Sequence, residues 1–119
     1  MDKKIFIENL KKESNLSNKS WILKVIKDSI DSNLSDGNPR GHRNLIIVME
    51  ELSELSKEIS KELRDKGDKI NILEELADVQ LGIYYVQEIC NIKDEELQKA
   101  INVKTKRLES VLKQYSIFK

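Results

Sequence analysis

Acidic residues recur at a fixed spacing in two stretches of the chain. Glu51 and Glu54 are three residues apart, and Glu75 and Asp78 repeat this spacing after a gap of twenty residues. Carboxylate oxygens are the ligands that hard cations such as Mg²⁺ and Mn²⁺ prefer, and Mg²⁺ often completes its shell with substrate phosphates. The chemistry that these residues suggest first is therefore metal-dependent reaction of a phosphorylated substrate.

The first acidic pair lies on a stretch with helical periodicity, about residues 43–64. On a helical wheel, the apolar residues of this stretch occupy an arc at about 40–160° from Glu51, whereas Glu54 and Glu58 fall at about 300° and 340°. The three acids therefore form a ridge along one edge of the apolar face.

The second acidic pair repeats this pattern on a predicted helix at about 69–90. Asp78 lies at about 300° from Glu75, again beside the apolar arc, and Gly82 follows one turn later on the same ridge. If the two helices pack antiparallel, the four acids meet at one half-buried place, where their repulsion requires a cation. The alternative is that these acids line a solvated helix face, with lysines as partners one turn away.

Helical periodicity and helix-forming residues dominate the whole chain, so the predicted fold class is all-α. Glycine and proline are rare, with four and one residues, and no long linker divides the chain, which predicts a single domain over residues 1–119. The segment at about 3–12 is compatible with a short N-terminal helix. The expected architecture is a helical bundle of four main antiparallel helices, at about 18–33, 43–64, 69–90 and 94–115.

The last predicted helix carries the opposite charge. Lys104 falls inside its apolar arc, and Arg107 lies one turn later. A lysine tolerates such a position by extending its stem along the apolar surface. In the functional interpretation, both cations contact phosphate oxygens beside the metal site.

The overall composition excludes several classes of function. The 21 basic and 21 acidic residues balance, so binding to a nucleic-acid polymer through bulk charge is not expected. No apolar run is long enough to cross a membrane, and the N-terminal segment is too charged for a secretory signal. The single cysteine, Cys90, is expected in the core of a protein from a reducing compartment, so the predicted location is cytoplasmic.

The acidic motifs resemble those of a known family. The run Glu50-Glu51-Leu-Ser-Glu54, followed by Glu75-Leu-Ala-Asp78, is similar to the Glu-x-x-Glu and Glu-x-x-Asp signature of the MazG-type all-α nucleoside triphosphate pyrophosphohydrolases. The resemblance covers about residues 43–110. It implies a Mg²⁺-dependent helical bundle, with Mn²⁺ as a substitute, that assembles as a homodimer or homotetramer and hydrolyses nucleoside triphosphates to the monophosphate and pyrophosphate.

The resemblance also assigns roles to individual residues. It implies metal ligation by Glu51, Glu54, Glu75 and Asp78, and Glu54 or Glu58 is the candidate to orient the attacking water. The residues Asn102, Lys104 and Arg107 resemble a phosphate-binding run of related enzymes. On one straight helix Asn102 lies about 160° from Lys104, so the two cannot serve the same site, and Asn102 is a candidate for a neighbouring subunit's site.

Two other functions fit the same features. A phosphoribosyl-ATP pyrophosphohydrolase shares the acidic helical design and differs in its substrate. A non-catalytic helical module for oligomerisation or protein interaction would use the apolar stripes for association and the charges for solubility.

Overall fold

The structure is a computed structural model that describes residues 2–35 and 41–117. Over these residues the chain forms five helices: α1 (Lys3–Lys12), α2 (Lys19–Ser35), α3 (His42–Leu63), α4 (Lys69–Ile89) and α5 (Asp94–Ile117). The predicted all-α class is confirmed. The four main helices lie close to their expected ranges, and the N-terminal segment is a helix as well.

The helix ends follow from local hydrogen bonding. The Asp68 carboxylate accepts hydrogen bonds from the amides of Ile70 and Asn71 at 2.9 and 3.4 Å and so caps α4. The Asn18 side chain caps α2 by accepting from the Trp21 amide at 3.1 Å. These short polar side chains satisfy amides that have no partner inside their own helix.

The chain leaves α3 and α4 through residues in the left-handed conformation. Glycine is the usual residue in this position, and Gly67 follows α3, but the left-handed residue after α3 is Asp65, with a φ of 57°. Asn91 has a φ of 56° and ends α4 in the same way, and the amide of Ile92 donates to the Gln87 carbonyl at 2.8 Å. Cys90, expected in the core, is exposed at this end of α4.

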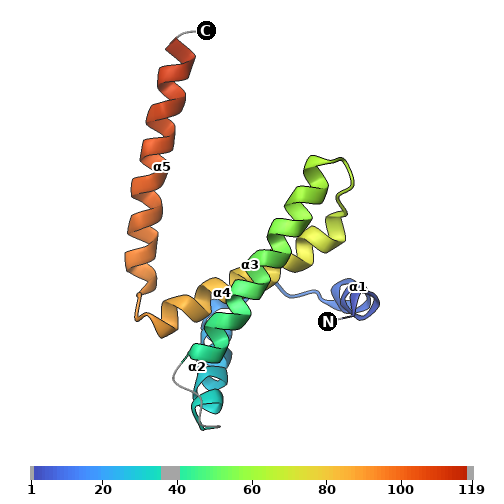
Figure 1. Cartoon of the computed structure of the whole chain (residues 1–119). Helices are drawn as coiled ribbons and strands as arrows, with labels where there is room; N and C mark the ends of the chain where they lie inside the picture. The colour runs from blue at the N-terminus through green and yellow to red at the C-terminus, as the bar shows by residue number, and fades with distance from the viewer. Residues whose placement is uncertain (1, 36–40, 118–119) are drawn as a thin grey trace.

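The helices α3 and α4 form an antiparallel hairpin, and α2 crosses it (Figure 1). Ile26 and Ile30 of α2 and Val48 of α3 are the buried apolar side chains among the described residues. Polar bonds join the same elements, since Tyr85 donates to Ser29 at 2.9 Å and Asn33 donates to Asn44 at 3.0 Å. The packed part of the fold therefore consists of α2, α3 and α4.

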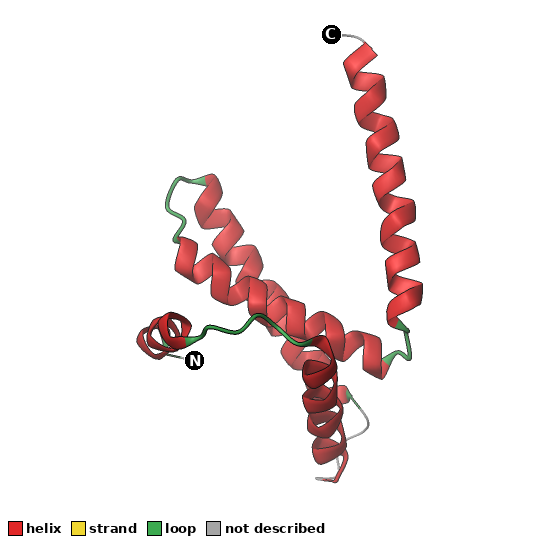
Figure 2. Cartoon of the chain, turned by 180° about the vertical axis from the view of Figure 1, so that it is seen from behind, coloured by secondary structure: helices red, strands yellow, loops and turns green. Residues whose placement is uncertain are grey.

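Helix α5 extends away from this packed part in both views (Figures 1 and 2). An ion pair between Lys19 and Asp94 fixes its first residue to the start of α2. Beyond that point its side chains are exposed, from Gln98 to Tyr115. The antiparallel bundle of four helices stays a prediction. None of the helices among the described residues has both the length and the apolar character that a membrane span needs.

Candidate metal centre

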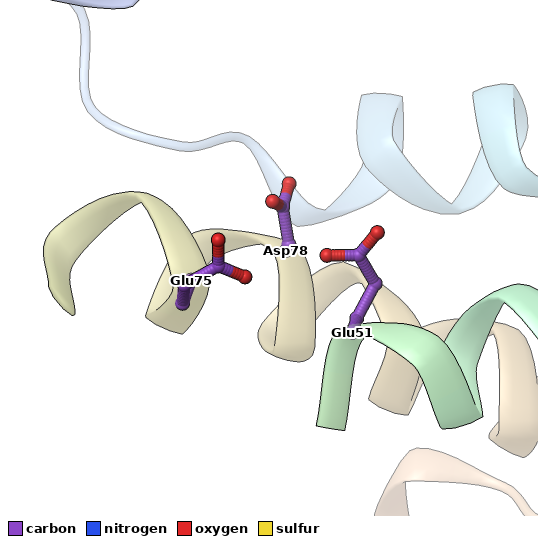
Figure 3. A group of neighbouring side chains, drawn as sticks. All are labelled: Glu51, Glu75 and Asp78. Carbon is purple, nitrogen blue, oxygen red and sulfur yellow. The ribbon is translucent and has the colours of Figure 1, made fainter. Parts of the chain in front are cut away.

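Three carboxylates meet between α3 and α4. Glu51 comes from α3, and Glu75 and Asp78 come from successive turns of α4. Each side chain offers an oxygen atom within 4.8 Å of the others, and Figure 3 shows them on the same side of the hairpin. The sequence pattern predicted that four acids of the two helices would meet. The structure brings three of the four together.

The close packing of α3 and α4 brings Glu51 and Asp78 together. Gly82 lies one turn after Asp78, and it is buried against α3. A Cβ atom built on Gly82 would approach Val48 Cγ1 at 3.2 Å, which is closer than ordinary van der Waals contact. The missing side chain at this position therefore admits the Val48 side chain and lets the two helices approach.

The three carboxylates repel one another when they are ionised. Partial burial, followed by the charge of Asp78 and a hydrogen bond to it, raises the pKa of Glu51 from 4.5 to about 6. Burial and the Asp78 charge also raise the pKa of Glu75. No ion pair between described residues reaches any of the three acids. Within the part of the chain that the structure describes, no ion pair therefore offsets the negative charge of the cluster.

Two carboxylate oxygens at this place have no hydrogen-bond partner. They are Oε2 of Glu75 and Oε2 of Glu58, and both atoms are buried. Removing an anionic oxygen from water without a partner is costly, and a bound cation or its water ligands would offset that cost. The donor set, made of carboxylates only, fits Mg²⁺ or Mn²⁺.

The other two acids of the α3 ridge lie beside the three. Glu54 is half exposed and its Oε1 accepts from Lys57 at 3.2 Å, yet its charge still raises the pKa of Glu75. Glu58 is only 8% exposed, and its Oε1 accepts from Lys61 at 3.1 Å. Glu54, a predicted ligand, is therefore outside the group of three, and Glu58 is the more buried of the two predicted water-orienting acids.

The predicted phosphate-binding residues are far from the acids in this chain. Asn102, Lys104 and Arg107 are exposed on α5, which points away from the α3–α4 hairpin (Figure 1). Lys104 does lie in the apolar stripe of α5, as the wheel predicts, beside Ile101 and Leu108. The distance between α5 and the hairpin means that these cations do not neutralise the acids of the same chain.

One feature of the site was missed in the sequence. A cavity of about 330 Å³ adjoins Glu51 and Asp78 and is lined on its other walls by α2, the start of α3 and the middle of α4. Its polar lining includes Asn33 and Asn44, which come from two helices and have no shared sequence motif. Of these two residues, only Asn44 could have been identified from the sequence, because it is a polar residue one turn before Val48 on the buried face of the helix.

The arrangement can hold a divalent cation between two helices and leaves room beside it for an organic ligand. This combination suits metal-dependent chemistry on a small phosphorylated molecule. The chain matches no family model, and searches for similar curated proteins and solved structures found none.

Proposed function

We propose that this protein is a Mg²⁺-dependent nucleoside triphosphate pyrophosphohydrolase that converts a ribo- or deoxyribonucleotide to the monophosphate and pyrophosphate. The observation that carries the proposal is the group of Glu51, Glu75 and Asp78, with oxygens within 4.8 Å of one another and no ion pair to a cation among the described residues. The resemblance to the MazG-type enzymes rests on the same residues. Mn²⁺ has similar ligand preferences and would substitute for Mg²⁺.

The three acids would hold the metal ion, and Glu54 would join them by turning from Lys57 toward the site. Bound Mg²⁺ would polarise the triphosphate and lower the pKa of a coordinated water. Glu58 fits the role of orienting that water, because its buried Oε2 is an acceptor with no partner. Glu54 is the other candidate for this role. No covalent nucleophile is needed.

Oligomerisation would supply the positive charge that the site lacks. We include in the proposal a homodimer or homotetramer in which α5 of one copy packs on the helices of another and completes a four-helix antiparallel bundle. Lys104 and Arg107 would then neutralise the departing pyrophosphate at the other copy's acids. Asn102, on another face of α5, would serve a different site.

The area of exposed surface supports this assembly. The chain has an accessible surface of 9749 Å², whereas a compact protein of 13.8 kDa has about 6,600 Å². The excess of about 3,100 Å² for each copy is larger than the roughly 1,000–2,500 Å² that each partner of a permanent dimer buries, so the chain has enough exposed surface for such an interface. Large apolar side chains such as Leu108, Leu112 and Tyr115 of α5 are each more than half exposed.

The proposed enzyme would work on the nucleotide pool of the cytoplasm, where the exposed thiol of Cys90 stays reduced. Its partner is a small nucleotide substrate, not a nucleic-acid polymer or a membrane, in keeping with the balanced charge of the chain.

The test is to incubate the protein with Mg²⁺ and a panel of nucleoside triphosphates, including phosphoribosyl-ATP, and to separate the products by ion-exchange chromatography. The proposal predicts monophosphate and pyrophosphate from at least one nucleoside triphosphate. Diphosphate and orthophosphate would mean that another bond is cleaved. Preference for phosphoribosyl-ATP would reassign the substrate.

A matched pair of variants ties the reaction to the site. Glu75→Gln removes a ligand and is expected to abolish hydrolysis, whereas Glu8→Gln changes an exposed acid of α1 and is expected to leave it intact. If the protein shows no hydrolysis and no Mg²⁺-dependent rise in melting temperature, the chain is better explained as a helical interaction module.

A further inference from the structure

A cavity of about 330 Å³ lies between α2, α3 and α4, beside the acidic group. Its volume is in the range of pockets that hold small organic ligands. Glu51 and Asp78 line one part of it, and Asn44 lines another part, two turns before Glu51 on the same helix. Seven residues of helix span about 10 Å, which is comparable with the length of a nucleoside.

The polar groups in this cavity are arranged in a defined pair. Asn44 is 5% exposed, and its Oδ1 accepts a hydrogen bond from Asn33 Nδ2 at 3.0 Å. A side-chain amide carries both a donor and an acceptor, so this bond leaves the carbonyl oxygen of Asn33 and the amino group of Asn44 for another partner. An acceptor next to a donor is the pattern that the edge of a nucleobase complements.

The walls of the cavity are suited to a flat, partly apolar ligand. Ile47 and Leu81 line it, as does the ring of Tyr85, whose hydroxyl donates to Ser29 at 2.9 Å. That bond holds the Tyr85 side chain against α2 at the wall of the cavity, where an aromatic residue suits contact with a base. Arg43, which precedes Asn44 on α3, also lines the cavity and adds a positive charge to its wall.

A hydrogen-bonded pair of asparagines can also serve simply to join two helices. The difference here is that the pair borders an open cavity, and that the same cavity reaches Glu51 and Asp78. A ligand that filled it would place its polar edge on the amides and its other end at the acidic group.

From this geometry we infer that the cavity binds the nucleoside part of the substrate, and that the Asn33–Asn44 pair selects the base. The inference depends on the proposed function for the identity of the ligand. It adds the place where the base binds and the residues that discriminate between bases.

The experiment uses the free nucleosides, without phosphate and without metal, so that neither catalysis nor the acidic group contributes to the readout. Each common ribo- and deoxyribonucleoside is titrated into the ¹⁵N-labelled full-length protein, and the side-chain amide signals of Asn33 and Asn44 are followed by NMR. We expect one base to shift these signals saturably at lower concentration than the others.

Three variants test the assignment. Asn33→Ala and Asn44→Ala should each weaken binding of the preferred nucleoside by about fivefold or more, the value of one lost hydrogen bond, and should reduce the discrimination between bases. Asn33→Asp keeps the volume of the side chain but removes the donor to Asn44 Oδ1. The Asn44 amide should then turn to donate to the new carboxylate and present its oxygen to the ligand, which should change the order of preference. Asn9→Ala, an exposed site on α1, is the control and should bind as the unaltered protein does.

The melting temperature of each variant establishes that it is folded. If Asn44→Ala unfolds, the variants of its half-buried partner, Asn33→Ala and Asn33→Asp, decide the question. Equal affinity for all nucleosides in the unaltered protein, or unchanged affinity in folded Asn33→Ala and Asn33→Asp, would overturn the inference. Triphosphate hydrolysis without nucleoside binding would reject the assignment of this cavity and leave the proposed function standing. Nucleoside binding without hydrolysis of any triphosphate would reject the proposed function and support the cavity as a nucleoside site.

Discussion

At the scale of single residues, the central feature is a group of carboxylates that destabilise one another. Burial and neighbouring charges raise the pKa values of Glu51 and Glu75, which means that folding makes their ionisation less favourable. Such a group lowers the stability of the folded protein when its carboxylates are ionised and no cation is bound between them. A divalent cation reverses that effect, because each negative charge then becomes favourable.

The raised pKa of Glu51 predicts a pH dependence in the metal-free protein. Its pKa is 4.5 when unperturbed and about 6 in the fold, so the folded state binds the proton more tightly than the unfolded state does. The Glu51 contribution to stability therefore falls as the pH rises from about 4.5 to 6 and is constant above that range. Thermal melts at pH 5 and pH 7 in EDTA measure this difference.

Comparison with Glu51→Gln isolates the effect of this group from other titrations. The variant should lose less stability than the unaltered protein between pH 5 and pH 7. The effect of added Mg²⁺ on the unaltered protein should show the opposite trend and be larger at pH 7, because the metal binds the ionised carboxylate. Parallel melting curves for both proteins would contradict the assignment.

A second prediction concerns removal of one charge. Asp78→Asn relieves repulsion on both Glu51 and Glu75, so the metal-free variant should melt slightly higher, by about 1 kcal/mol or less for this half-exposed group. The same change removes a ligand and should lower the hydrolysis rate by more than about 100-fold, since even residues that only support ligands contribute 10–100-fold. Differential scanning fluorimetry and the product assay measure the two effects. A variant that is less stable without metal and still fully active would contradict this prediction.

At the scale of helices, the sequence predicted where each element lies but not how all of them pack. Capping residues such as Asp68 and the apolar period determine helix limits locally, and the structure agrees with them within a few residues. The meeting of Glu51 with Glu75 and Asp78 was also predictable, because a short connection makes two neighbouring helices antiparallel.

The place of α5 could not be predicted in this way. An apolar stripe shows which face of a helix is to be covered, but it does not show whether the same chain or another one covers it. The Asn33–Asn44 pair was missed for a related reason: these residues belong to different helices and become neighbours only through tertiary packing.

The contact at Gly82 leads to a prediction about the hairpin. Gly82→Leu places a side chain against Val48, whose Cγ1 a Cβ atom would already approach at 3.2 Å, so Val48 and with it α3 should shift from α4. We expect a loss of about 1–3 kcal/mol, typical of overpacking, and a weaker stabilisation by Mg²⁺ because Glu51 moves away from Asp78. Ala77→Leu enlarges an exposed residue on the same helix and is the control. Unchanged melting and unchanged response to Mg²⁺ in Gly82→Leu would contradict the role of this contact.

Helix α5 leads to a prediction about catalysis. Lys104→Ala should lower kcat/KM by about 100-fold, as loss of one group that stabilises developing charge does in other enzymes. Stabilisation by Mg²⁺ alone should persist, because the metal ligands remain. Lys106→Ala lies on a different face of α5 and is the matched control. Equal losses in both variants would mean that only the overall charge of α5 matters.

At the scale of the whole molecule, one copy of the chain is more extended than a compact protein of its length. Its radius of gyration is 17.8 Å, whereas a compact chain of this length has about 13.5 Å. Three buried apolar side chains among the described residues make a small core for five helices. The exposed faces of α3, α4 and α5 are therefore the surfaces that a second copy would cover.

This leads to a prediction about assembly. Light scattering coupled to size exclusion should give a mass of two or four times 13.8 kDa. Leu108→Glu together with Leu112→Glu, in the exposed stripe of α5, should reduce that mass and the activity together. A monomeric protein with full activity would contradict the proposed assembly.

Mixing two inactive variants tests whether the copies share their sites. When Glu75→Gln and Lys104→Ala chains are unfolded together and refolded, half of a dimer population combines both chains. One of the two sites in each mixed dimer is then intact, which should restore about a quarter of the activity. No recovery would place the acids and Lys104 of each site on one chain.

The measurement that tests the central claim most directly is calorimetric titration of the metal-free protein with Mg²⁺ and with Mn²⁺, beside the double variant Glu51→Gln with Asp78→Asn. The account predicts saturable binding to the unaltered protein, with affinity that rises between pH 5 and pH 7, and no saturable binding to the folded double variant. Equal binding by the two proteins, or no binding by either one, would contradict the claim that Glu51, Glu75 and Asp78 form a metal site.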